Sequence, residues 1–466
     1  MIAIGKALRT ALLGLIAFAV AQPAAAQDAE KPNIVVIFVD DMAWGDMSAN
    51  GAGAWIETPH LDALAASGIR FTDGYAASAV CGPSRVGLLT GVYPARLGVW
   101  WNPDTTKAEM PESQPLMPQL MRANGYDTAV IGKWNLANEA RSVADTVIGP
   151  MIWGGVYHPG EDGSYEGVGY GWGAGGHASG HWIAEDEDGE YLTDWLTRGA
   201  VSYIDGHRGE KPFFMYLAYN APHSPIEASA RYREQVSHLP TQPMQFYAAM
   251  LLAVDDGVGE VRAALERRGM TENTLVFFIS DNGPATDGFR GWPEDWPETQ
   301  LGVTGSLSGH KGELREGGIR VPFVASWPAR IPAGQVNAFP VTTVDLYRTF
   351  EDMFGLSEPY GELADGNSLL PLLTGQANEL PSRDIYWQKR ICRKNGKCVD
   401  SAAVRHGNFK LLYEDGGEPQ FFDLAADPGE SADVSAQYAN RFRNMTGRYA
   451  EWKAALPEPN GDKAKK

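Results

Sequence analysis

Cys81 stands apart from the other cysteines of this sequence. The chain has three cysteines, and two of them, Cys392 and Cys398, flank the stretch RKNGK, whose Asn395-Gly396 pair is typical of a hairpin turn. Such a turn can bring the two sulfurs face to face, so we predict a structural disulfide between them in an oxidising compartment. Cys81 is then the unpaired thiol, which is either inert in the core or chemically special.

Polar residues follow each of four apolar runs that are rich in β-branched and aromatic residues. The runs span residues 33–39, 128–131, 212–219 and 274–280, and they predict buried parallel strands. Because the carboxyl ends of the strands in an open α/β sheet share one edge, where ligands bind, the residues that follow could converge on one site. These residues are Asp40, Asp41, Lys133, His223, Asp281 and Asn282.

Two acidic pairs among these residues indicate a metal site. Asp40, Asp41, Asp281 and Asn282 offer only oxygen ligands. Such ligands favour a hard cation, for which we choose Ca²⁺ with Mg²⁺ as the alternative, over Zn²⁺. Acidic residues at strand ends can instead be solvated turns or helix caps. Two pairs that converge with the segment around Cys81 favour the metal.

The segment that begins at Cys81 matches the string C-x-P-S-R-x-x-x-L-T-G in full, over residues 81–91. It resembles the signature of the formylglycine-dependent sulfatases, in the alkaline phosphatase superfamily. The resemblance implies a maturing enzyme that recognises Cys81, Pro83 and Arg85 and converts the cysteine to formylglycine. Pro83 also suits the first turn of a helix, so we expect Cys81 at a helix N-terminus, which is a natural anion site.

Further segments resemble other motifs of the same family, in the family's order. They are PNIVVIFVDDMAWGD, GYDTAVIGKW, YLAYNAPHSP, FFISDNG and HKGELREGGIRVP. The last of these would be the loop that carries the family's second lysine, Lys311. The resemblance extends over nearly all of the chain after residue 26, and it implies a sulfuric ester hydrolase.

The resemblance also implies a mechanism. A sulfate ester resists hydrolysis because its attacking and leaving oxygens develop negative charge beside an anionic group, so the site needs cations and a strong nucleophile. One hydroxyl of hydrated formylglycine would attack sulfur, and deprotonation of the other would expel the sulfate. Arg85 and Lys133 would steady formylglycine, while Lys311 and His223 would contact the sulfate. His223 would protonate the leaving oxygen, and the converted side chain of Cys81 would add an oxygen ligand to the metal.

One position departs from the family. Most relatives have histidine two residues after the signature lysine, where this chain has Asn135 in GKWNLA. The family histidine is thought to take a proton from the diol, and asparagine cannot accept one at neutral pH. A different base, slow turnover or different chemistry would follow. The candidate substitutes are His310, beside Lys311, and the loop histidines His158, His177 and His181.

The first 26 residues are typical of a secretory signal peptide. Lys6 and Arg9 precede an apolar run that closes on three alanines at 24–26. The uninterrupted run over 11–21 is shorter than the roughly 20 residues that a membrane span needs. We therefore expect an exported protein, periplasmic or secreted, with no membrane span.

The predicted fold is α/β, with a large mixed and mostly parallel sheet sandwiched by helices, as in alkaline phosphatase. Helix signals alternate with the strands, such as Thr58-Pro59 before LDALAAS, where Thr58 is the N-cap candidate. We place a catalytic domain at 27–355 and a smaller α+β subdomain of short strands and a terminal helix, from about Ser435 to Ala455, at 356–460. The tail 461–466 is predicted to be disordered.

The composition limits which kinds of molecule the protein can bind. A formal net charge of −19 argues against nucleic acid or an anionic membrane. Residues 151–190 predict long loops, whose tryptophans suit either pyranose rings or core packing. We predict a sulfated carbohydrate as substrate, with Asn135, His310 and the loop residues as contacts. The loop residues are Trp153, Trp172, Trp182, His177 and His181.

Three alternatives stay open at this stage. Within the enzyme class, the chain could be an arylsulfatase or a phosphonate or phosphate ester hydrolase of the same superfamily. Outside it, the chain could be an inactive relative that binds sulfated glycans, an interpretation that Asn135 keeps open.

Overall fold

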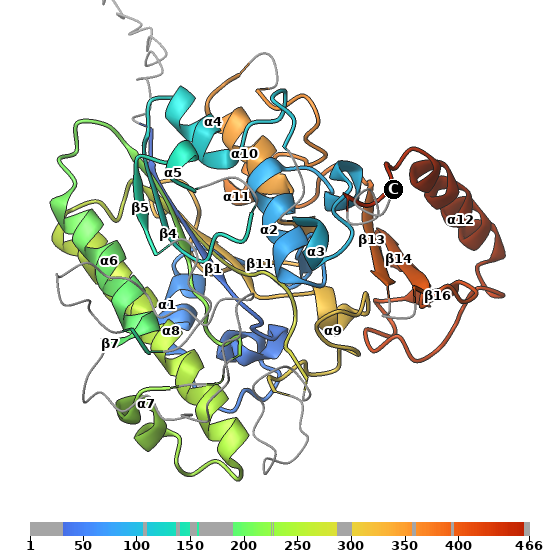
Figure 1. The fold of residues 1–466 in the computed structure, drawn as a ribbon, viewed down its shortest axis with the longest axis horizontal. Coiled ribbons are helices and arrows are strands. Elements are labelled where there is room, and N and C mark those ends of the chain that lie inside the picture. The colour runs from blue at the N-terminus through green and yellow to red at the C-terminus, as the bar shows by residue number, and fades with distance from the viewer. Residues whose placement is uncertain are drawn as a thin grey trace, which may run out of the picture. The chain divides into compact units, whose positions relative to one another are not determined.

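Four parallel strands form the centre of an eight-stranded sheet (Figure 1). They are β9 (Thr274–Ser280), β1 (Asn33–Val39), β8 (Phe213–Ala218) and β4 (Asp127–Gly132), in this spatial order. Four shorter strands complete the order β11-β2-β10-β9-β1-β8-β4-β5, in which β10 runs antiparallel to β9 and to β2. The shorter strands are β2 (Ile69–Phe71), β5 (Thr146–Ile148), β10 (Phe323–Ser326) and β11 (Gln335–Asn337).

The structure is a computed structural model, in which residues Pro32–Lys466 form one compact unit. The signal peptide predicted at 1–26, the loop residues His158, His177, His181, Trp153, Trp172 and Trp182, and the tail 461–466 lie outside the described residues. The described residues are 31–105, 110–136, 140–149, 156–157, 190–224, 226, 228–286, 301–356, 360–392 and 396–460.

Helices cover both faces of the large sheet. Alternate residues of β1 point to opposite faces, so Val35 and Ile37 pack in one core cluster and Val36 and Phe38 in another. The first cluster includes side chains of α1 (Pro59–Ala66), α6 (Leu192–Gly206) and α8 (Gln242–Arg267). The second includes side chains of α2 (Cys81–Thr90), α4 (Met117–Ala123) and α10 (Asp345–Met353).

Burial on both faces explains why the central strands are continuous apolar runs. The predicted α/β fold is confirmed, and the strand ends agree with the expected ranges to within one residue. Five further short helices are α3 (Asn102–Thr105), α5 (Ala140–Val143), α7 (Ala230–Gln235), α9 (Glu316–Ile319) and α11 (Leu370–Leu373). Small ladders pair β3 (Gly74–Tyr75) with β12 (Val341–Thr342), and β6 (Val156–Tyr157) with β7 (Glu190–Tyr191).

Helix α1 begins where the sequence predicts, but its N-terminus is capped differently. The side chain of Thr58 bonds to Ser48 and Asp62 and makes no capping hydrogen bond. The carboxylate of Asp255, in α8, instead accepts from the backbone N–H groups of His60 and Leu61, at 3.1 and 2.8 Å. A distant side chain therefore satisfies the free N–H groups of the first turn.

A second, antiparallel sheet contains the strands after residue 380. It consists of β13 (Asp384–Cys392), β14 (Cys398–His406), β15 (Phe409–Tyr413) and β16 (Gln420–Asp423). One face packs against α12 (Ala439–Ala454), which begins four residues after the predicted start at Ser435. The other face, which includes Trp387, packs against Ala77, Ala79 and Leu314 beside the loop before Cys81.

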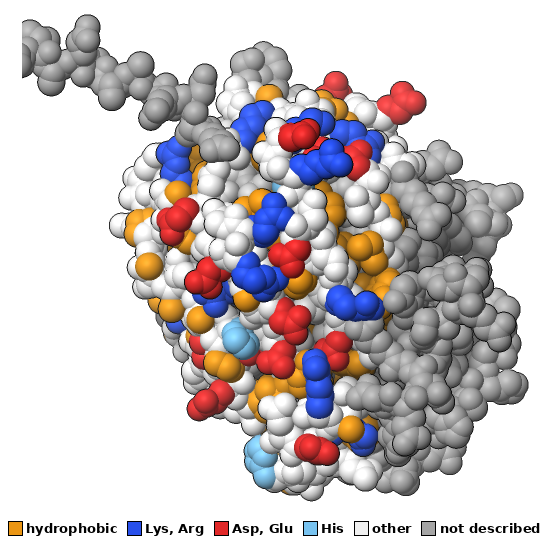
Figure 2. All heavy atoms as spheres, turned by 90° about the vertical axis from the view of Figure 1, so that its left-hand side faces the viewer, with side chains coloured by type: hydrophobic (Ala, Val, Ile, Leu, Met, Phe, Trp, Pro, Cys, Tyr) orange, Lys and Arg blue, Asp and Glu red, His pale blue; other side chains and the backbone are white. Residues whose placement is uncertain are grey.

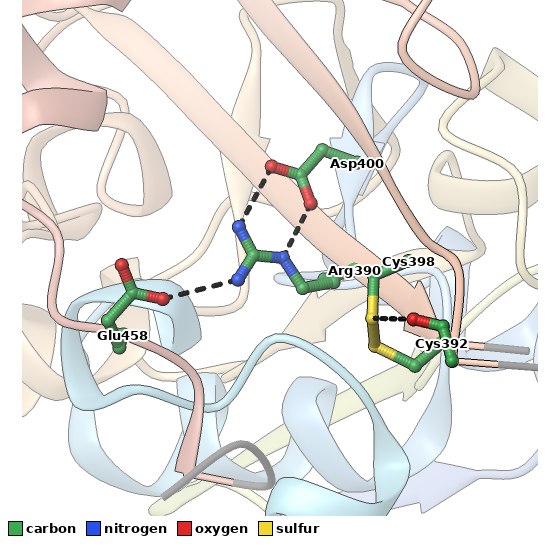
Figure 3. The surroundings of a disulfide bond; sticks show 6 residues. Arg390, Cys392, Cys398, Asp400 and Glu458 are labelled. Atoms are coloured by element: carbon green, nitrogen blue, oxygen red, sulfur yellow. Dashed lines mark hydrogen bonds and ion pairs between the residues drawn. A yellow bond between two sulfur atoms is a disulfide. The ribbon is translucent and has the colours of Figure 1, made fainter.

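Cys392 and Cys398 form the predicted disulfide at the end of the β13–β14 hairpin (Figure 3). The two residues are direct partners in the strand register and are six positions apart. Their side chains therefore meet across the ladder, as expected for a short β-ribbon.

Replacing both cysteines with serine is expected to lower the free energy of unfolding by about 2 kcal/mol, because the cross-link closes a short loop in the unfolded chain. Turnover should be unchanged, since neither sulfur lies among the groups around Cys81. Urea unfolding and kcat/KM of the double variant test this expectation. Non-reducing peptide maps of the unaltered protein that yield both residues as free thiols would contradict the cross-link itself.

Charged side chains of both signs are interspersed on the face that Figure 2 shows. Among the described residues coloured there, no broad area belongs to one sign. None of the helices in the described part of the chain has the length and apolar character that crossing a membrane requires.

Candidate active site

The carboxyl ends of the four central strands bring the predicted polar residues together. Asp40 and Asp41 follow β1, Asp281 and Asn282 follow β9, Lys133 follows β4, and His223 lies in the segment after β8. Ligand atoms of Asp40, Asp41, Cys81 and His223 all lie within 4.8 Å of one another.

Cys81 is the first residue of α2, as the position of Pro83 predicts. The preceding residue, Val80, has extended backbone, and the helix ends at Gly91, whose φ of 69° is the left-handed conformation that favours glycine. Every residue of α2 is buried. The backbone N–H of Gly82 is bonded to the side chain of Asn102 at 3.0 Å. The helix N-terminus that carries Cys81 is thus held rigidly inside the protein.

Arg85 ties α2 to the strand ends. Its guanidinium donates to Asp281 Oδ2 at 2.9 Å and lies 3.5 Å from Asp40 Oδ2. It also donates to the carbonyl of Lys133 at 2.9 Å and to the hydroxyl of Tyr216, in β8, at 3.0 Å. Because the side chain is fully buried, these contacts fix its position.

Two lysines complete the positive charge of the site. Lys133 Nζ pairs with Asp40 Oδ2, and Lys311 Nζ lies 2.6 Å from Asp41 Oδ1. His223 Nε2 lies 3.9 Å from Asp41 Oδ2, while its Nδ1 donates to the carbonyl of Ser224. The Nε2 atom therefore faces the carboxylates. All three cations and the histidine surround the space next to Cys81.

Asp40 and Asn282 retain ligand capacity that the described part of the chain does not use. Asp40 Oδ1 and Asn282 Oδ1 are buried and have no hydrogen-bond partner among the residues that the structure describes. The amide nitrogen of Asn282 donates to Asp41 and to the carbonyl of Gly283, which leaves the oxygen as the free atom. Buried polar atoms are rarely left unsatisfied. An all-oxygen donor set with such atoms fits a hard divalent cation.

Backbone strain marks the same place. Asp41 has a φ of 69°, which is uncommon for a residue other than glycine. Its N–H donates to Asp281 Oδ1 at 3.2 Å, so the turn after β1 is tied to the end of β9. Strained backbone of this kind is concentrated at functional sites.

Burial and charge shift the protonation equilibria of the site. Burial and the neighbouring Asp40 raise the pKa of the Cys81 thiol, so at neutral pH the unmodified residue is a thiol and not a thiolate. Burial and Lys311 lower the pKa of His223, which favours its neutral form. For Asp40, burial would raise the pKa, but Lys133 and the other cations outweigh it and hold the pKa well below its usual range.

Asn135 lies beside the helix N-terminus. A Cβ atom added to Gly82 would lie 3.0 Å from Asn135 Nδ2, 2.5 Å from Thr105 Oγ1 and 3.1 Å from Asn102 Oδ1. Gly82 is thus enclosed by neutral polar side chains, and none of these three can take a proton at neutral pH.

Of the histidines that could replace the missing base, His310 lies among the described residues. Both of its ring nitrogens face groups of its own loop. Its Nδ1 bonds to the carbonyl of Lys311 at 3.0 Å, and its Nε2 lies 3.5 Å from Glu313. His158, His177 and His181 lie outside the described residues.

Sequence reasoning missed several residues that contact this site. Tyr216 lies within an apolar strand, where tyrosine is common. Nothing in the sequence therefore indicates its hydrogen bond with Arg85. Asn102 and Thr105 lie in the short helix α3, outside every recognised motif.

Comparison with known families identifies the chain. A family model described as Sulfatase matches residues 32–356, and a second, described as N-sulphoglucosamine sulphohydrolase, C-terminal, matches residues 310–452. N-acetylgalactosamine-6-sulfatase of Mus musculus is 32% identical over 401 residues, which cover 79% of this chain and 70% of that protein. N-acetylgalactosamine-6-O-sulfatase of Bacteroides thetaiotaomicron is 28% identical, with coverage of 90% and 93%.

Solved structures agree with the sequence relatives. The crystal structure of Ps i-CgsB in complex with k-i-k-neocarrahexaose superposes with a TM-score of 0.75 at 30% identity, covering 92% of this chain and 94% of that one. The phosphonate monoester hydrolase of Agrobacterium radiobacter, at 21% identity and a TM-score of 0.65, shares the fold. Since the Sulfatase model matches well over half of the chain and the mouse enzyme exceeds 30% identity, the chain belongs to the sulfatase family and is a sulfuric ester hydrolase.

Proposed function

We propose that this protein removes sulfate from sulfated carbohydrates, with formylglycine at position 81 and a calcium ion held by Asp40, Asp41, Asp281 and Asn282. The observation that carries the proposal is the position of Cys81, at a buried helix N-terminus within 4.8 Å of two carboxylates and His223. As a thiol with a raised pKa, Cys81 would be a poor nucleophile. Its conversion would resolve this difficulty.

When bound, the metal and formylglycine would supply a polarised sulfate and an activated oxygen nucleophile. The chain's own residues do the rest. Lys133 and Arg85 hold the pKa of Asp40 down, and Arg85 joins Asp40 and Asp281 to the end of α2. Lys311 and the N-terminus of α2 stabilise negative charge that develops on the sulfate oxygens. His223 Nε2 is placed to hold the proton that the leaving oxygen takes up.

A carbohydrate substrate is supported by the relatives. The mouse and Bacteroides proteins are named as sulfatases of N-acetylgalactosamine, and the Ps i-CgsB structure is a complex with k-i-k-neocarrahexaose. We also propose export, from the signal peptide predicted at residues 1–26, and maturation by a formylglycine-generating enzyme that acts on the Cys81 segment.

Coexpression with a formylglycine-generating enzyme is expected to convert Cys81 and to switch on desulfation. Mass spectrometry of the peptide that contains Cys81 should show an aldehyde in place of the thiol. Turnover of a panel of sulfated saccharides should rise in proportion to the converted fraction. Cys81→Ala, which cannot be converted, is the matched control and should be inactive.

Full activity in a preparation that contains only the thiol would refute the role of formylglycine. A phosphonate ester is compared as an alternative substrate. It is made from the same alcohol as the sulfate ester that the enzyme hydrolyses fastest. A higher kcat/KM on that phosphonate would favour the phosphonate hydrolase alternative. Tight binding of sulfated saccharides without turnover by fully converted protein would favour an inactive binding protein.

A further inference from the structure

Lys389 is an exception among the buried basic residues. Five of the six lysine and arginine side chains that are buried in the described residues have a carboxylate oxygen within 4.0 Å. The sixth, Lys389, is 8% exposed and has no such partner among the described residues. Its ammonium group donates to the carbonyl of Gly312 at 2.5 Å. The five paired residues are Arg85, Lys133, Lys311, Arg405 and Lys410.

A buried charge without a counterion is costly. Taking an ammonium group out of water costs several kcal/mol, which a nearby carboxylate normally offsets. Burial lowers the pKa of Lys389, and the more distant Asp415, Glu313 and Glu414 do not cancel this effect. A neutral donor could make the single hydrogen bond to the carbonyl of Gly312, so this bond does not explain a charged side chain here. The residue therefore has capacity for an anion that the described residues do not provide.

The neighbouring Arg390 shows the contrast. It forms two contacts with Asp400, at 2.7 and 3.2 Å, and a third with Glu458 at 3.2 Å (Figure 3). Because successive residues of a strand point to opposite faces, Arg390 and Lys389 point away from each other. Lys389 shares its face with Trp387, whose indole N–H donates to the carbonyl of Ala76, directly after β3. Lys389 therefore points toward the active-site side of β13.

Lys389 lies at the edge of the candidate active site. Gly312, which accepts its hydrogen bond, directly follows Lys311 and donates to the carbonyl of Ala79 at 2.8 Å. Ala79 is two residues before Cys81. The Lys389 contact is therefore adjacent to Lys311 in one segment and separated from Cys81 by one residue in the other.

An aromatic ring lies beside the ammonium group. Lys389 Nζ is 6.0 Å from the ring centre of Trp101, which is only partly buried. A Cβ atom added to Gly312 would lie 3.5 Å from Cη2 of this ring, so Trp101 packs over the same glycine. Asn102, the next residue, bonds to Gly82 in the first turn of α2. A tryptophan face next to a cation suits a sugar ring that carries an anionic group.

We propose that Lys389 and Trp101 form a subsite for a second anionic group of the substrate, which is a carboxylate or another sulfate. This group would lie on the sugar that carries the scissile sulfate or on the neighbouring sugar. The proposal rests on the sulfatase function proposed above and specifies its substrate class as saccharides with at least two anionic groups. The anion would take the place that carboxylates occupy at the other five buried cations. Trp101 would contact the apolar face of the sugar ring.

The test uses matched substrates built on the sulfated sugar that the unaltered enzyme desulfates. One carries the scissile sulfate alone, one adds a hexuronate, and one adds a second sulfate. The readout is the ratio of kcat/KM for each doubly anionic substrate to that for the singly anionic one. Lys389→Met, which removes the charge and keeps an unbranched side chain one atom shorter, should lower the ratio at least about tenfold for one of the two. This corresponds to about 1.4 kcal/mol.

The substrate whose ratio falls shows whether the subsite binds a carboxylate or a sulfate. Lys389→Arg should retain most of the ratio, and Arg390→Met, which removes the paired neighbour, should leave it unchanged. An unchanged ratio in Lys389→Met would overturn the subsite. This includes the case in which kcat/KM falls equally for the singly and doubly anionic substrates, because then only the contact with Gly312 has been lost. Failure of the converted, unaltered enzyme to desulfate every member of the saccharide panel, before any matched substrate is built, would instead reject the proposed function.

Discussion

Asp281→Asn is expected to lower turnover on the order of 10²–10³-fold and to reduce the bound calcium measured by elemental analysis well below one ion per chain. A bound metal contributes several kcal/mol of charge stabilisation in the transition state, which corresponds to a factor of this size. The asparagine keeps the shape of the side chain and an oxygen that can accept from the N–H of Asp41. It removes the negative charge that a hard cation and Arg85 both need.

Loss of stability alone would not produce this result, and a control can show it. Asp255 is another buried carboxylate, and with His60 and Asp256 it forms the second cluster of possible metal ligands in the described residues. Its carboxylate accepts from the N–H groups at the start of α1. Asp255→Asn should therefore lower the melting temperature while calcium content and turnover are retained. Wild-type turnover of Asp281→Asn after exhaustive chelation would show that the metal site has been misplaced.

The sheet edge could be predicted because its physical causes are local in sequence. A strand covered on both faces must be apolar along its length, so β1 and β9 are visible as runs that end at acidic pairs. Pro83 marks the start of α2 for a similarly local reason. These features place Cys81 and the acidic pairs near one another before any contact is known.

Long-range contacts could not be predicted in the same way. The carboxylate that caps α1 comes from Asp255, 195 positions after His60, so Thr58 was the wrong expectation for the capping side chain. Arg85 is held by a carbonyl and by Tyr216, neither of which has a distinctive sequence. The contact of Lys389 with Gly312 joins residues 77 positions apart, one in β13 and the other in the turn before α9. Single-sequence periodicity does not contain this information.

Asn135→His is expected to speed turnover, by as much as the roughly 10²–10⁴-fold that general bases typically contribute. The substitution restores a proton acceptor beside Cys81, where the present neighbours of Gly82 have none. Asn135 has a φ of 59°, and histidine tolerates this left-handed backbone better than most residues. If the step that releases sulfate limits the unaltered enzyme, it should show an initial burst of released alcohol. The burst should disappear in the histidine variant as steady turnover rises.

The pH dependence separates a base from a change of shape. A histidine accepts a proton only when neutral, so the gain should appear as the pH rises through its ordinary value of about 6.5 and be lost below it. Lys133, two residues away, would move that limb to lower pH by disfavouring the charged ring. Asn135→Gln, which fills similar space without a base, should show neither the gain nor the limb. An unaltered enzyme without a burst, together with a slower histidine variant, would mean that Asn135 makes room for substrate and that the base is His310 or one of the loop histidines His158, His177 and His181.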